Sequence, residues 1–76
     1  MAKVRLTLES LGSTHQMEPT DKDQAVDLMV EYVGRRWDID DEERAELQVV
    51  IDAVVITGTP LEYDGLAPIY VRVEKA

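Results

Sequence analysis

The chain has 76 residues, with 16 Asp and Glu against 8 Lys and Arg, so its formal net charge is −8. A chain of this length forms one small acidic domain over residues 1–76, which buries a little over about 60% of the surface its unfolded chain exposes. Because it has no cysteine, a disulfide framework and the usual Cys/His zinc sites are excluded. The negative charge disfavours direct binding to nucleic acid and to anionic membranes.

The hydropathy of the chain gives no sign of a membrane protein. No apolar run reaches about 18 residues, and no basic segment is followed by an apolar stretch of the signal-peptide kind. We therefore expect a cytoplasmic protein that has no membrane partner.

Alternating apolar and polar residues predict a half-buried strand over residues 3–9. Gly12 then begins a turn. Residues 14–18 are predicted as a short return strand, which Pro19 ends because it cannot donate to a ladder. The apolar residues of the first strand are Val4, Leu6 and Leu8.

The rest of the chain is organised around a long helix predicted over residues 20–37. Thr20 is placed to cap its first turn. Gly34 is either the left-handed residue that closes the helix after Val33 or an interior glycine, and we favour continuation because Trp37 completes the apolar face. The apolar residues that recur at helical spacing, and that we expect in the core, are Val26, Met29, Val30, Val33 and Trp37.

The opposite face of this predicted helix carries a row of carboxylates. Asp23, Asp27 and Glu31 are spaced four residues apart, so each like-charge pair costs about 0.2 to 0.5 kcal/mol in an isolated helix. Arg35 is the base that we expect to relieve the row. We predict that all three carboxylates are exposed and otherwise lack structural compensation.

A second group of carboxylates opens the next predicted helix. Asp40 or Asp41 is placed to cap it. From Leu47 onward the apolar residues have helical spacing, yet most are β-branched, which favours strands. We predict a short helix over residues 41–51 and a buried strand over residues 53–57, with the boundary between Leu47 and Val54 left open. The acidic members of this segment are Asp38, Asp40, Asp41, Glu42, Glu43 and Glu46.

The C-terminal part of the sequence predicts a hairpin. Asp64 and Gly65 are typical of a tight turn, so we expect the chain to double back there. Pro68 marks an edge or a strand start, and residues 69–74 alternate as a last strand.

These elements predict an α+β domain with two layers. Strands at both ends and helices between them imply a three- or four-stranded, mostly antiparallel sheet. The long helix and a short second helix pack on one face, in the order β(β)ααββ.

No pattern in the sequence points to catalysis or to a cofactor. His15 is the single histidine and is interpreted as a loop residue, and no glycine-rich phosphate loop is present. Residues 38–43 offer carboxylates of the kind that calcium prefers, but the glycine and glutamate of an EF-hand are missing. A solvated helix N-terminus is the favoured interpretation. We expect no catalytic residue, no cofactor and no metal.

Two hypotheses for function remain. The first is a non-enzymatic binding protein that occupies a basic surface of a partner, such as a nucleic-acid-binding protein or complex. Carboxylates one helical turn apart match the spacing of DNA phosphates within roughly a factor of two, so the face could act as a nucleic-acid mimic, like the inhibitors that phages encode. The predicted partner-binding residues are Asp23, Asp27, Glu31, Asp38, Asp40, Asp41, Glu42, Glu43 and Glu46.

The alternative is a structural or assembly subunit. It would associate with a larger protein, or with itself as a homodimer, through an apolar edge strand or a patch around Trp37. The acidity would then serve only solubility. Salt dependence distinguishes the two hypotheses, because salt weakens a charge-driven complex far more than an apolar interface.

Overall fold

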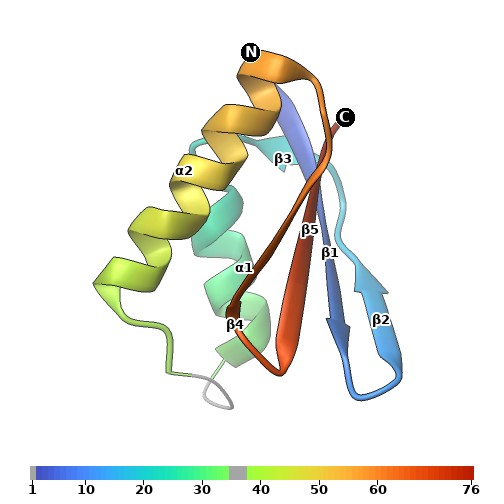
Figure 1. Ribbon diagram of the computed structural model, residues 1–76, viewed down its shortest axis with the longest axis vertical. Coiled ribbons are helices and arrows are strands. Elements are labelled where there is room, and N and C mark those ends of the chain that lie inside the picture. Colours follow the sequence, from blue (N-terminus) through green and yellow to red (C-terminus); the bar gives the residue numbers. More distant parts are fainter. Residues whose placement is uncertain (1, 35–37) are drawn as a thin grey trace.

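The computed structural model describes residues 2–34 and 38–76. The described residues form one antiparallel sheet with two helices on the same face of it, as Figure 1 shows. The predicted α+β class and its two layers are confirmed. The elements are β1 (Lys3–Ser10), β2 (Ser13–Gln16), β3 (Thr20–Asp21), α1 (Ala25–Val33), α2 (Asp41–Thr57), β4 (Leu61–Leu66) and β5 (Ile69–Lys75).

The first and last strands lie side by side at the centre of the sheet. The strand order is β2-β1-β5-β4, and Leu6 of β1 pairs with Val73 of β5. Both strands were predicted from their alternation, which reflects one face on the core and one on solvent. The predicted return strand is confirmed as β2, although it begins at Ser13 and ends at Gln16.

A short strand, β3, stands where we predicted the start of the long helix. Thr20 pairs with Val4 of β1, so Thr20 is not the helix cap. Pairing with β1 continues on both sides of Pro19. Before the proline, the Met17 N–H donates to the Leu6 carbonyl at 2.9 Å. After it, β3 pairs with β1. The helix begins only at Ala25.

The first helix is also shorter than predicted at its C-terminal end. It ends at Val33, and Gly34 adopts a φ of 64° while its N–H donates to the Val30 carbonyl. Gly34 therefore closes the helix, because a residue with a side chain rarely adopts such a φ. The predicted place of Trp37 in the core, and the predicted role of Arg35, lie outside the described residues.

The second helix is the long one, which reverses the predicted order of lengths. α2 continues for 17 residues to Thr57, so the predicted strand over residues 53–57 is wrong. Leu47, Ile51 and Val54 recur at helical spacing and are buried against the sheet, and this burial outweighs strand propensities that differ by less than about 1 kcal/mol. Across residues 2–34 and 38–76, no helix is both long enough and apolar enough to cross a membrane.

The C-terminal hairpin turns three residues later than predicted. The turn falls at Ala67 and Pro68, between β4 and β5. Asp64 and Gly65 lie inside β4, at an irregularity between Tyr63 and Leu66. A Cβ at Gly65 would overlap the Tyr63 hydroxyl and ring, so this glycine makes room for a side chain.

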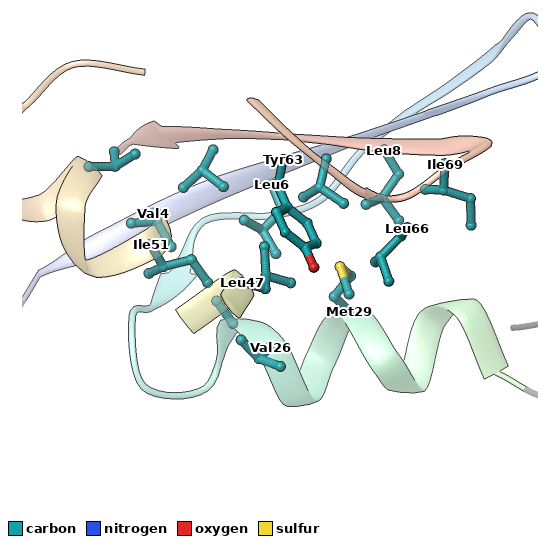
Figure 2. Packing of buried hydrophobic residues seen from close by; sticks show 14 residues of the cluster. Val4, Leu6, Leu8, Val26, Met29, Leu47, Ile51, Tyr63, Leu66 and Ile69 are labelled. Carbon is teal, nitrogen blue, oxygen red and sulfur yellow. The ribbon is translucent and has the colours of Figure 1, made fainter. Parts of the chain in front are cut away.

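The core lies between the sheet and both helices (Figure 2). Val26 and Met29 of α1 are buried as predicted, whereas Val30 and Val33 are half-buried and pack against its edge. The other buried apolar residues are Val4, Leu6, Leu8, Ala25, Leu47, Ile51, Val54, Tyr63, Leu66, Ile69, Val71 and Val73.

Candidate functional surface

The two parts of the fold differ in charge. Residues 3–16 and 61–75 form the sheet apart from β3, and their four acidic and four basic residues balance. Residues 22–60, which include both helices, hold ten acidic and four basic residues, a net charge of −6. Residues 17–21 add the remaining −2. The ten acidic residues are Asp52 and all nine predicted partner-binding residues.

The predicted row of three carboxylates is divided by the fold. Asp23 precedes α1, and its carboxylate lies 3.1 Å from the Lys22 ammonium. Asp27 lies on α1, 3.3 Å from the Arg44 guanidinium of α2. The expected lack of compensation is therefore wrong for these two residues, although such exposed pairs contribute only about 0–1 kcal/mol. Glu31 is exposed one turn further along α1.

Asp40 and Glu43 are held together at the start of α2. The Asp40 carboxylate accepts a hydrogen bond from the Glu43 N–H at 2.7 Å, and the Glu43 carboxylate accepts one from the Asp40 N–H at 3.1 Å. This reciprocal capping box shows that Asp40, and not Asp41, is the cap of the two that the sequence offered. Both carboxylates therefore have a structural role, whatever else they bind.

The other carboxylates of this segment extend into solvent. Asp41 and Glu42 lie in the first turn of α2, where the positive end of the helix dipole favours negative charge. Asp38 precedes that turn and Glu46 follows it, and all four residues are exposed. Together they add negative charge to the N-terminal part of α2 and the segment before it.

Tyr63 of β4 brings a hydroxyl into the core. The residue is 7% exposed, and its hydroxyl has no hydrogen-bond partner among the described residues. Figure 2 shows the ring entering the core from β4 with the hydroxyl directed toward Met29. Burial raises the pKa of Tyr63 above its usual value, and the carboxylates of Glu46 and Glu43 raise it further.

A stacked aromatic pair bridges the edge of the sheet and α1. The rings of His15 and Tyr32 lie nearly parallel, with centroids 4.1 Å apart. His15 was interpreted as a loop residue, but it lies in β2. An open hollow of about 550 Å³ adjoins the pair and is lined by residues that include Met17, Leu28 and Glu31. Polar side chains also line it, among them His15, Gln16 and Glu18.

Neither outer strand presents a long apolar edge. All four residues of β2 are exposed and polar. β4 carries Glu62 and Asp64 and is irregular between Tyr63 and Leu66, which discourages pairing with another strand.

Within residues 2–34 and 38–76, no three acidic or histidine side chains gather to hold a metal ion.

One surface feature was missed by the sequence analysis. Val49 and Ile56 are 67% and 83% exposed on the outer side of α2, whereas we assigned the region around them to a buried or undecided segment. The signal was present as a second helical period: Ala45, Val49, Ala53 and Ile56 are separated by steps of four, four and three.

Comparison with known proteins adds no assignment. No family model, curated protein or solved structure matches the chain. The candidate surface therefore depends on its own geometry. It is an acidic helical layer packed on a sheet whose acidic and basic residues are equal in number.

Proposed function

We propose that this protein is a non-enzymatic binding protein whose acidic helical layer occupies a basic surface of a partner protein. The observation that carries the proposal is the separation of charge, with −6 over residues 22–60 and zero over most of the sheet. Charge that served only solubility would work equally well if both signs were spread over the whole surface. Charge gathered on one layer instead attracts and orients a basic partner.

Proteins that bind nucleic acid are the partner class this surface fits best. They expose extended basic patches that contact phosphates. Asp27 and Glu31 are one turn apart on α1, a rise of about 6 Å, and Asp41 and Glu42 add charge at the start of α2. We infer that the protein acts as a nucleic-acid mimic and inhibits such a partner, in the way of the small acidic inhibitors that phages encode.

The fold narrows the set of residues that should carry this binding. Asp40 and Glu43 cap α2, while Asp23 and Asp27 already contact basic side chains. The carboxylates best placed to meet a partner are those that are exposed, have no capping role and are not paired with Lys22 or Arg44. They are Glu31, Asp38, Asp41, Glu42 and Glu46.

The test compares charge reversal on the two layers. One variant combines Glu31→Lys with Glu42→Lys on the helices, and its control combines Glu9→Lys with Glu62→Lys on the sheet. All four positions are exposed, and each variant changes the net charge from −8 to −4. Immobilised protein is used to capture basic proteins from a lysate at low and high salt, after circular dichroism confirms that both variants fold.

We expect the helix variant to lose the captured proteins and the sheet variant to retain them, with release by high salt. Equal loss in both variants would mean that net charge alone matters and would contradict a binding face. Capture that persists at high salt and in both variants would instead favour the assembly-subunit alternative.

A further inference from the structure

The outer side of α2 bears an apolar stripe that lies opposite the core. Ala45, Val49 and Ile56 are exposed and Ala53 is half-buried. With 3.6 residues per turn, the four side chains project within roughly 40° of the Val49 direction. The residues that pack on the sheet project from the other side of the helix, and in Figure 1 the side of α2 away from the sheet is open.

Folding does not account for this stripe. Valine and isoleucine have lower helix propensity than alanine because their χ1 angles are restricted, and at these positions the described chain buries neither side chain. A single exposed apolar residue is ordinary. Apolar residues that recur over three turns form the kind of seam along which a second helix packs.

Carboxylates line both sides of the stripe. Glu46 lies on the side toward β4, where its carboxylate raises the pKa of Tyr63. Asp52 lies on the other side, with its carboxylate 3.7 Å from the Lys22 ammonium. Glu42 lies at the N-terminal end. Arg44, a basic residue of α2, forms an ion pair with Asp27 of α1. The stripe is therefore apolar at its centre and bordered by carboxylates, of which Glu42 and Glu46 are exposed and Asp52 is paired with Lys22.

We infer that the outer face of α2 binds a basic amphipathic helix of the partner protein. Apolar residues of that helix pack on Val49 and Ile56, and its Lys and Arg side chains meet the exposed carboxylates Glu42 and Glu46. The inference rests on the proposed function and specifies the element that docks. A second copy of the chain fits poorly, because it would bring two helical layers of net charge −6 together.

The test uses a synthetic 18-residue amphipathic helix of Leu and Lys, with Leu at positions spaced i, i+3, i+4 and i+7. A scrambled peptide of the same composition is the charge control. Binding is measured by fluorescence anisotropy at low salt for the wild type, for Val49→Ala with Ile56→Ala, and for Leu11→Ala. Leu11 is a matched control because it is 91% exposed but lies in the β1–β2 turn.

We expect the wild type to bind the amphipathic peptide at least tenfold more tightly than the scrambled one. The α2 double variant should lose most of this preference while its melting temperature stays the same or rises, and Leu11→Ala should keep it. Amide chemical shifts should change along α2.

Three results would overturn the inference. If the scrambled peptide binds equally well, charge alone is recognised, and the proposed function stands without this docking element. The same holds if the α2 double variant binds like the wild type. If the 8.6 kDa chain sediments as a dimer and the double variant as a monomer, the stripe joins two copies. Failure of the proposed function is separate, since it appears as equal capture by the two charge-reversal variants.

Discussion

Tyr63 carries a polar atom into an apolar core, and its neighbours make that placement possible. Gly65 leaves the space that the ring occupies, since any Cβ there would overlap it. The hydroxyl has no partner among the described residues, and an unsatisfied buried polar group costs about 1–3 kcal/mol. Burial and the carboxylates of Glu46, Glu43 and Asp40 all disfavour the phenolate.

This environment predicts a pH dependence that belongs to Tyr63. Its pKa is higher in the folded chain than the usual value of 10.0, so the neutral phenol is favoured by folding. The corresponding stability is fully present below pH 10 or so and is lost as the pH rises toward the folded pKa. Tyr63→Phe should therefore be at least as stable as the wild type at neutral pH and should lose less stability under alkaline conditions.

Urea unfolding at neutral and alkaline pH measures the effect, with Tyr70→Phe as the control because Tyr70 is 41% exposed. The pKa of Lys22 is also raised, chiefly by its hydrogen bond to Asp23, and this contribution is common to all three proteins. If the wild type and Tyr63→Phe lost the same unfolding free energy at alkaline pH, the loss could not be assigned to Tyr63.

The helix caps matter more for α2 than for α1. Asp40 and Glu43 satisfy two backbone N–H groups at the start of α2, whereas Gln24 provides no side-chain cap for α1. Replacement of Asp40 by Ala should cost about 0.5–2 kcal/mol of unfolding free energy. Asp38→Ala is the control, since Asp38 precedes the cap and is exposed. Chemical denaturation monitored at 222 nm compares the two, and equal stability would show that the box contributes nothing.

Element boundaries could be predicted where a local pattern and the tertiary fold agree. In β1 and β5 the alternation reflects one buried face, so the strands were identified from the sequence. The prediction of a strand over residues 53–57 failed because β-branched residues favour strands only weakly. Val54 is instead buried on a helical period against the sheet, which a local pattern does not reveal. At Asp64 and Gly65 the turn signal was present, but Gly65 accommodates Tyr63 instead.

The candidate surface was predictable to a similar extent. All of its carboxylates could be identified in the sequence, and the cap was narrowed to Asp40 or Asp41, of which the structure has Asp40. The contact between Asp27 and Arg44 joins residues 17 positions apart on two helices, so it depends on how α1 and α2 pack. The exposed stripe around Val49 became visible only once the buried side of α2 was known.

At the scale of the whole molecule, the unequal distribution of charge should make folding sensitive to salt. The helical layer concentrates like charges, and repulsion among them opposes the compact state. Raising the ionic strength from about 0.01 M to 0.15 M shortens the Debye length from about 30 Å to 8 Å, which screens repulsion between neighbouring turns more than it weakens exposed ion pairs such as that of Asp27 with Arg44. The melting temperature of the wild type should therefore rise with salt.

The two charge-reversal variants locate the origin of this dependence. In Glu31→Lys with Glu42→Lys, several like-charge neighbours become opposite pairs, each worth about 0.2–0.5 kcal/mol, so the rise with salt should become smaller. Glu9→Lys with Glu62→Lys changes the net charge equally but leaves the helical layer intact, so it should keep more of the dependence. Thermal unfolding in sodium chloride measures all three proteins. A wild-type melting temperature that falls with added salt would mean that ion pairs such as Asp27 with Arg44 outweigh the repulsion, and the helical layer would then be electrostatically satisfied without a partner.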